Sequence, residues 1–497
     1  MTATPETEQF DVVIVGAGLS GIGTGCHLRI NLPEKTFVIL EGRERLGGTW
    51  DLFRYPGVRS DSDMYTLGYR FRPWRAAKAI ADGPSILRYI TETAQDYGVY
   101  EKIRYLHRAV RASWSSEESV WTIEAEVGEQ KEISRIRAKF LYLCTGYYEY
   151  TQGYKPEWPG LERFAGTLVH PQQWPEDLDY SGKRVVVIGS GATAVTLVPA
   201  MAHSAEHVTM LQRSPSYLLS LPSEDLIATR MRRWLPMKSA YSLARWKNVL
   251  VTMFFFNLSR KRPEIMKRLI AKGVRQHLGD GYSEHFTPKY NPWDQRMCFV
   301  PDSDFFLAVR SGKASVVTDQ IEAFIDSGLR LRSGRVLDAD IVVTATGLVM
   351  RIFSGLELKV DGEPVDLREK MLYKGIMLSD VPNMAAAIGY TNASWTLKCD
   401  LTADYVCRLL KYMDRRGYDY CLPLRNGSDT GEEPIVDFSS GYVQRALPHL
   451  PRQGSRRPWR LRQNYIRDLI TLRYGRILDG TMHFGRKTGR CATLAKA

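Results

Sequence analysis

Three glycines near the start of the chain have the spacing that a bound pyrophosphate requires. Gly16, Gly18 and Gly21 follow the apolar run FDVVIV and precede a helical pattern. The first glycine permits a tight turn, the second lets backbone approach the phosphates, and the third lets helix and strand pack closely. The helix N-terminus adds free N–H groups. The next strand, TFVILE, ends at Glu41, whose carboxylate can accept hydrogen bonds from ribose hydroxyls.

A second glycine turn, VVVIGSGATA, carries Gly189, Gly191 and Ala194 in G-x-G-x-x-A spacing. The strand after it ends at Arg213, where the first site has an acid. An acid there repels a 2′-phosphate, whereas an arginine binds one. The first site is therefore expected to hold an adenosine without a 2′-phosphate, and the second to prefer NADPH over NADH. The same site is predicted to include Ala192, Thr193 and Ser214.

The stretch GRERLGGTWDLFRYPGVRSDSDMY follows Glu41 directly. Gly48, Thr49 and Trp50 are predicted to bring backbone and an aromatic ring close to a flat ligand. An ordinary glycine loop with a packed tryptophan is the alternative interpretation.

Two β-rich runs that end in Thr-Gly indicate how the sheets that position these turns are connected. FLYLCTGYY (140–148) and DIVVTATGL (340–348) indicate points where the chain leaves one sheet for the other. The second run adds Thr346 and Gly347 to the predicted cofactor-binding residues.

The sequence thus predicts an α/β fold of two interleaved Rossmann-like dinucleotide-binding domains with a mainly helical insertion. The FAD-binding domain is expected over 1–146 and 386–497. The NADPH-binding domain is expected over 147–215 and 292–385, and the helical insertion over 216–291.

Composition supports large packed cores and excludes several other classes. The 497 residues are 44% hydrophobic and 11% aromatic, and no apolar run reaches the roughly eighteen residues of a membrane span. The seven cysteines are odd in number and lack CxxC spacing. Neither a disulfide framework nor a metal site is expected, and a reducing cytoplasm is the simplest location.

The net charge of +13 is concentrated in two regions. Residues 226–276 hold thirteen Lys or Arg and one acid, and residues 452–497 hold twelve and two acids. A solvated surface with a phosphate-bearing ligand is the favoured interpretation. Peripheral association with an anionic membrane is the alternative, because NVLVTMFFFNLSRKR (248–262) joins apolar and basic residues. No recognition motif points to nucleic acid.

The apolar part of that basic region contains an aromatic group that allows two interpretations. Its rings would pack in a helix core or line a route for an apolar substrate, and core packing is favoured. The group is Trp246, Phe254, Phe255 and Phe256.

Between the two glycine turns, Phe164, Gly166, His170, Trp174 and Pro175 match the fingerprint F-x-G-x-x-x-H-x-x-x-W-P. The chain thereby resembles the Baeyer–Villiger monooxygenases, a group of class B flavoprotein monooxygenases, over essentially its whole length. The resemblance implies FAD and NADPH as cofactors, with NADP⁺ retained during catalysis. It also implies a structural role for the histidine, which couples domain position to catalysis.

Four longer segments look like a mycobacterial-type branch of that family, which includes an ethionamide-activating monooxygenase. They are GGTWDLFRYPGVRSDSDMYTLGYRFRPW (47–74), HPQQWPEDLDY (170–180), YNPWDQR (290–296) and GYTNASWTLK (389–398).

The resemblance assigns the catalytic arginine to Arg296 and its partner carboxylate to Asp61, and it adds Asp61 and Tyr65 to the cofactor-binding residues. Many members have a lysine where this chain has Gln295, so the contacts around the arginine are in doubt. A fixed guanidinium suits the stabilisation of negative oxygen in a site shielded from water.

The implied reaction begins with NADPH and O₂ and proceeds through a C4a-peroxyflavin. This species inserts one oxygen beside the carbonyl of a small apolar ketone, giving an ester or lactone, with sulfoxidation of thioethers or thioamides as a side activity. A class B enzyme acting mainly on nitrogen or sulfur is the alternative. A flavin disulfide reductase is disfavoured because no CxxC or CxxxxC pair occurs. The sequence does not predict the oligomeric state.

Overall fold

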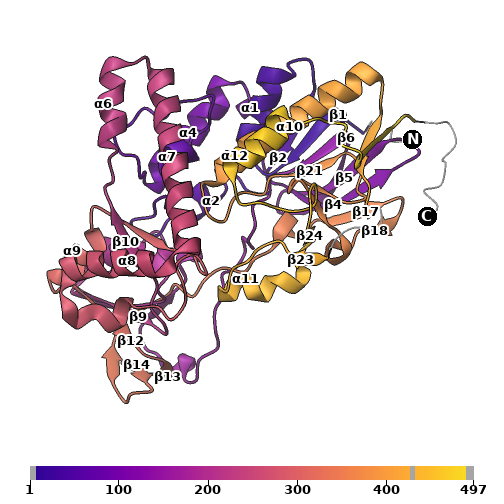
Figure 1. The fold of residues 1–497 in the computed structure, drawn as a ribbon. Helices are drawn as coiled ribbons and strands as arrows, with labels where there is room; N and C mark the ends of the chain where they lie inside the picture. The colour runs from indigo at the N-terminus through magenta and orange to yellow at the C-terminus, as the bar shows by residue number, and fades with distance from the viewer. Residues whose placement is uncertain (1–6, 426–430, 488–497) are drawn as a thin grey trace.

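The computed structural model describes residues 7–425 and 431–487 (Figure 1). Cys491 and the basic residues beyond position 487 lie outside this part of the chain. Within it, two sheets each form the centre of one nucleotide-binding unit, and a group of helices lies beside both.

The first sheet has a parallel centre and an antiparallel flank. Its strands are β1 (Gln9–Val15), β2 (Phe37–Leu40), β3 (Ile103–Arg104), β4 (His107–Ser115), β5 (Val120–Val127), β6 (Glu132–Leu143), β17 (Glu357–Val360), β18 (Glu363–Pro364) and β21 (Met384–Ala386). They lie in the order β18-β17-β4-β5-β6-β1-β2-β3, with β21 also paired to β6. Val12, Val13 and Ile14 of β1 are fully buried, because a strand covered on both faces must be apolar throughout.

Helices cover this sheet and place its first turn. They are α1 (Leu19–Asn31), α2 (Thr49–Leu52), α3 (Met64–Leu67), α4 (Gly83–Asp96) and α10 (Trp395–Arg416). α1 packs against α10 and α4, so a helix from the last quarter of the chain supports the first glycine turn. Of the short C-terminal helices, α12 (Tyr465–Asp468) packs against α10, whereas α11 (Gly441–Ala446) lies lower in the view of Figure 1.

The second sheet is entirely parallel. Its strands are β7 (Thr167–Val169), β8 (Arg184–Ile188), β9 (His207–Gln212), β12 (Ala314–Thr318) and β16 (Ile341–Thr344). Their order is β12-β9-β8-β16-β7, and helices α5 (Ala192–Met201) and α9 (Asp304–Arg310) belong to the same core. The two Rossmann-like units that the sequence predicts are thus present.

The insertion forms three helices that contact both units. They are α6 (Leu226–Trp234), α7 (Met237–Lys261) and α8 (Pro263–Leu278). α7 packs against α3 of the first unit, while α8 packs against α9 of the second. The predicted range 216–291 also contains a strand, β10 (Leu218–Leu221), which pairs with β11 (Cys298–Pro301).

The predicted end of the NADPH-binding domain differs from the sheet pairing. The NADPH-binding domain was expected to run to residue 385, but β17 pairs with β4, and β21 pairs with β6. The chain therefore rejoins the first sheet at Glu357. These strands are short, and nothing in their sequence separates them from the unit that precedes them.

Two linkers cross between the units side by side. They follow β6 and β16, and backbone hydrogen bonds join them. Glu149 N donates to Val349 O at 2.7 Å, Arg351 N to Tyr147 O at 3.0 Å, and Tyr154 N to Gly347 O at 3.0 Å. Both predicted Thr-Gly segments lie at these crossings, as the sequence indicated.

The aromatic group of α7 is largely exposed instead of packed in a core. Phe254 is 62% exposed and Phe255 43%, whereas Phe256 packs edge-on against Trp293. The prediction of core packing was wrong for the two exposed rings. Among the described helices, none is long and apolar enough to cross a membrane.

Candidate active site

The first glycine turn is packed backbone against backbone. Gly16 has a φ of +101°, and a Cβ on Gly21 would lie 1.8 Å from the carbonyl oxygen of Gly16. Gly48, with a φ of +57°, would bring a Cβ to 3.0 Å from the Cα of Gly18. No side chain caps the N-terminus of α1, so its N–H groups are free to receive a phosphate. This geometry fits the pyrophosphate of a dinucleotide.

Glu41 closes the turn from the end of β2. Its carboxylate accepts hydrogen bonds from the backbone N–H groups of Ala17 at 2.8 Å and Arg43 at 3.0 Å. Burial raises the pKa of Glu41, and the two hydrogen bonds oppose that rise. The side chain is therefore held where the sequence analysis placed a ribose partner.

The second turn is more open. Gly189 has a φ of +141°, and a Cβ there would lie 2.3 Å from Ala345 O, but nothing lies within 4 Å of a Cβ on Gly191. The N-terminus of α5, which begins with Ala192 and Thr193, also lacks a side-chain cap. Arg213 is exposed and makes no ion pair within the described residues. Ser214 is held near the turn, because Ser190 Oγ donates to its carbonyl oxygen at 3.1 Å.

Arg296 and Asp61 meet across the junction of the two units. Arg296 Nη2 lies 2.8 Å from Asp61 Oδ2. The neighbouring Arg59 forms a second ion pair with Asp304. Each of the two segments therefore supplies one arginine and one aspartate to the contact. The Asp61 carboxylate is the largest cause that raises the pKa of Arg296 above its already high value. The guanidinium therefore stays charged while its side chain is still 39% exposed.

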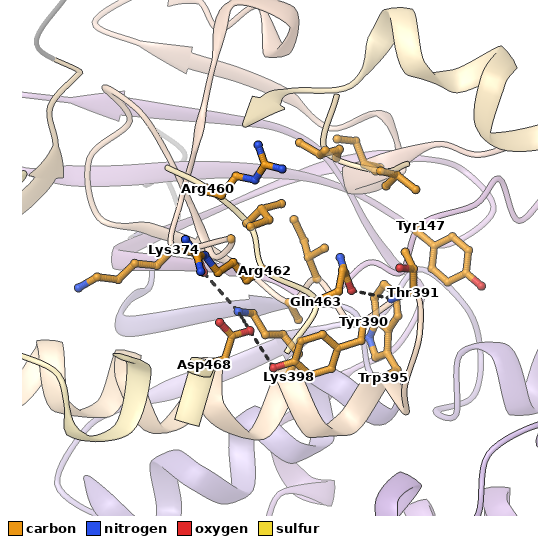
Figure 2. Close-up of a pocket in the computed structure, with 18 of the residues that line it drawn as sticks. Tyr147, Lys374, Tyr390, Thr391, Trp395, Lys398, Arg460, Arg462, Gln463 and Asp468 are labelled. Carbon is orange, nitrogen blue, oxygen red and sulfur yellow. Dashed lines mark hydrogen bonds and ion pairs between the residues drawn. The ribbon is translucent and has the colours of Figure 1, made fainter. Parts of the chain in front are cut away.

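That exposed surface of Arg296 contributes to the walls of two cavities. The larger cavity has a volume of about 740 Å³ and is also bordered by Thr145, Gly146 and Tyr147 of the first linker. The smaller, of about 140 Å³, is bordered by Asp61 and Trp293. In the larger cavity Tyr147 stacks on Trp395 with ring centroids 5.0 Å apart (Figure 2). A cation fixed between two cavities can stabilise negative charge on a ligand that enters either one.

The fingerprint residues flank the edge strand β7: two of them precede the strand, and the other three lie in the turn that follows it. Phe164 packs edge-on against Phe324, and a Cβ on Gly166 would lie 2.5 Å from the Phe164 ring. Trp174 packs against the core of the second unit, and Pro175 next to it is exposed. The fingerprint therefore fixes the local packing of this edge.

His170 is the fingerprint residue that packs against the first linker. Its Nδ1 accepts from Gln172 N at 3.2 Å, and its ring fills the space beside Gly153. Burial and the nearby charge of Lys155 lower the pKa of His170 to about 4. The imidazole is thus neutral at physiological pH. Thr346 supports the same crossing by donating to Tyr154 O at 2.5 Å.

Three predicted cofactor residues have different surroundings. Thr49 accepts a hydrogen bond from Tyr148 OH at 2.5 Å, and Trp50 is partly buried against the first core. Tyr65 is fully buried, and its hydroxyl accepts from Arg232 Nη2 at 2.9 Å. Tyr65 therefore faces the helical insertion and lines neither cavity.

Sequence reasoning missed the wall that the C-terminal region builds. Residues 435–479 contribute much of the larger cavity, including Arg462 and Arg467. The excess of basic residues in 452–497 was interpreted as a solvated surface with a phosphate-bearing ligand and not as the wall of a cavity. Sequence reasoning also missed a buried charge cluster in which His27 lies 3.2 Å from Asp400 and 3.3 Å from Asp404. Nothing in the sequence joins these distant positions.

Comparison with known proteins agrees with this geometry. The model of the flavin-binding monooxygenase-like family matches residues 80–413, and that of the NAD(P)-binding Rossmann-like domain matches residues 14–78. The chain is 53% identical to the FAD-containing monooxygenase EthA of Mycobacterium tuberculosis, over 97% of this chain and 99% of that protein. It is 50% identical to the probable FAD-binding monooxygenase AlmA of Acinetobacter baylyi, over 97% of each chain.

Solved structures show the same architecture. Oxidized steroid monooxygenase bound to NADP superposes with a TM-score of 0.70 at 25% identity, covering 83% of this chain and 88% of that one. The open structure of cyclohexanone monooxygenase gives a TM-score of 0.71 at 20% identity, covering 84% and 90%, and supports the fold alone. The family model and the full-length relatives together place this chain in the flavin-binding monooxygenase family.

Proposed function

We propose that this protein is a Baeyer–Villiger monooxygenase that uses FAD, NADPH and O₂ to convert ketones into esters or lactones and also oxidises sulfur compounds. The observation that carries the proposal is the Arg296–Asp61 pair, in which Arg296 borders both cavities and Asp61 borders the smaller one. The full-length relatives carry FAD in their names, and the steroid monooxygenase structure contains NADP.

The glycine turns supply the two nucleotide sites. The first turn and Glu41 would hold FAD, because a dinucleotide needs close backbone approach and a ribose acceptor. The second turn with Arg213 would hold NADPH, because a guanidinium binds the 2′-phosphate that Glu41 would repel. Bound flavin, once reduced, supplies the activation of O₂.

The chain's own contribution to the reaction is charge placement and the exclusion of water. Arg296 would stabilise the negative charge that develops on the substrate oxygen, and Asp61 would hold the guanidinium in position. Removal of one such donor typically costs about 3–4 kcal/mol of barrier. His170 would act as a positioning residue for the retained NADP⁺, because its neutral ring is packed against the first linker.

The test replaces Arg296 with alanine. We expect ketone oxygenation to fall about 100- to 1000-fold while reduction of the bound flavin by NADPH continues at the parent rate. Stopped-flow reduction and product analysis by mass spectrometry separate the two steps. Arg310→Ala, which removes an exposed arginine of α9, is the control. Ester formation by Arg296→Ala at the parent rate would overturn the role.

The same assay decides between carbon and heteroatom chemistry. Ketones and thioethers of similar size are supplied with NADPH, and the ester and sulfoxide products are measured. Sulfoxide without ester from every ketone would favour an enzyme that acts mainly on nitrogen or sulfur.

We also propose that α6 and the turn after it bind the surface of an anionic membrane. Residues 233–239, RWLPMKS, are all exposed, and Trp234 is 82% exposed. Leu226 and Ile227 at the other end of α6 are 74% and 59% exposed. Apolar side chains among exposed cations are the pattern of an interfacial segment.

Co-sedimentation with vesicles tests this surface. We expect binding to vesicles that contain anionic lipid and little binding to neutral ones, with a loss in Trp234→Ala/Leu235→Ala. Leu307→Ala, an exposed leucine of α9, is the control. Equal sedimentation of all three proteins would exclude this surface as the membrane contact.

A further inference from the structure

The larger cavity is divided into an apolar part and a charged part. Beside Arg296, its wall includes Met350, Phe438 and Tyr442, which belong to one hydrophobic cluster with Trp293. At the other end, Lys374 and Lys398 meet the segment 457–476, which contains Asp468. Figure 2 shows the aromatic rings of Tyr147 and Trp395 on one side and the charged groups on the other.

The two lysines of the charged part have carboxylate partners of their own. Lys398 Nζ lies 2.6 Å from Asp468 Oδ2, and Lys374 Nζ lies 2.9 Å from Asp479 Oδ2. Tyr390 OH donates to the same Asp468 oxygen at 2.8 Å. These groups are therefore satisfied and would bind a further anion only weakly.

Four arginines of the same wall have no such partner. Within the described residues, none of them makes a side-chain ion pair or hydrogen bond. They are Arg457, Arg462, Arg467 and Arg476. Arg460, between them in the chain, pairs with Glu433. Like charges gathered in a concave wall repel one another and attract anions from solution.

The cofactor phosphates do not account for this charge. Neither glycine turn borders the cavity, and neither does Arg213, the expected partner of the 2′-phosphate. The cavity instead reaches Arg296, where the substrate would react. The unpaired arginines thus lie on the substrate side of the site.

We propose that the substrate is an aliphatic ketone that carries an anionic end group, such as a carboxylate. The four arginines bind this anionic group while the ketone carbonyl lies beside Arg296. The apolar wall of the cavity covers the aliphatic part of the substrate between these two ends. This inference rests on the proposed function, because it assumes that Arg296 marks the reacting end. Arginine suits the task because its planar fork binds a carboxylate with two parallel hydrogen bonds.

The experiment compares two substrates that differ only at the far end. One is a straight-chain methyl ketone, and the other is the oxo acid of the same length with its carbonyl in the same place. We expect the oxo acid to have the lower KM in the parent enzyme. In Arg462→Gln/Arg467→Gln its KM should rise about tenfold with kcat little changed, while the methyl ketone keeps its KM. Added salt should raise the KM of the oxo acid in the parent more than in the variant.

Arg456→Gln is the matched control, because Arg456 is exposed in the same segment but does not border the cavity. It should leave both substrates unchanged. Equal KM values for the two substrates in the parent enzyme would overturn the inference. So would a rise in the KM of the oxo acid that is as large in Arg456→Gln as in Arg462→Gln/Arg467→Gln.

A binding measurement without turnover separates this inference from the proposed function. Calorimetry of the flavin-loaded protein with a saturated fatty acid should show a Kd about tenfold higher in Arg462→Gln/Arg467→Gln. Arginine-dependent binding in a protein that oxygenates no ketone would refute the proposed function alone. Ketone oxygenation with arginine-independent binding would refute this inference alone.

Discussion

The two glycine turns share a spacing but differ in how tightly the protein surrounds them. Around the first, α1 is buried continuously from Leu19 to Leu28, and Glu41 is enclosed. Around the second, Gly191 and Arg213 are exposed. The difference indicates that the first ligand is a permanent part of the protein, whereas the second must enter and leave. On the proposed assignment, one motif would serve a permanently bound FAD and an exchanging NADPH, and the surroundings would decide which.

The largest expected effect separates the turns directly. Gly21→Ala would place a Cβ 1.8 Å from a backbone oxygen, so the turn must deform at a cost of about 3 kcal/mol or more. We expect this variant to be purified without flavin absorbance. Gly191→Ala meets nothing within 4 Å and should keep its flavin. Equal flavin content in the two variants would break the comparison.

The next effect concerns the support behind the first turn. Burial alone would lower the pKa of His27, but hydrogen bonds to Asp400 and Asp404 outweigh it and raise the pKa from 6.5 to about 9. The folded state therefore holds the proton more tightly, which stabilises it by about 3 kcal/mol below the unfolded pKa. This contribution should disappear as pH rises through about 9.

Denaturant unfolding of the parent and His27→Gln measures it. The difference in unfolding free energy should be large near neutral pH and small near pH 10, by the linkage above. A difference that does not vary with pH would mean that His27 is not protonated in the fold.

The third effect tests the openness of the second turn. Arg213→Gln should raise the KM for NADPH about tenfold and leave the KM for NADH unchanged, because only NADPH has the 2′-phosphate. Steady-state kinetics with both nucleotides measures this. Arg275→Gln, on the surface of α8, is the control. A parallel rise for both nucleotides would show that Arg213 does not read the phosphate.

The smallest effect concerns His170, whose pKa is lowered to about 4. Between this value and 6.5 the unfolded chain binds the proton and the folded protein does not, so stability falls as pH falls. At about pH 5.5 the loss is about 1 kcal/mol, and His170→Asn should be free of it. Urea midpoints at this pH and at neutral pH measure the difference, which should have the opposite pH trend to that of His27.

The sequence predicted those features of the fold and of the site that depend on residues close together in the chain. Both glycine turns, Glu41 and Arg213 lie within one βαβ unit each, so their spacing alone indicates their placement. Arg296 and Asp61 are 235 positions apart in the numbering, and only the resemblance to a family joined them before the fold did. The cavity wall from 435–479 and the return of the chain at Glu357 depend on long-range packing that leaves no local pattern.

The doubled crossing between the units limits how they can move. Two peptide segments joined at Glu149–Val349 and at Tyr147–Arg351 resist stretching and bending together, as neighbouring β-strands do. We expect the remaining soft motion to be torsion about their common axis. We expect such torsion to alter the Arg296–Asp61 contact, which spans the units, while each glycine turn keeps its shape. The protein would then adjust the position of its reactive cation by an angle, with no change in either nucleotide site.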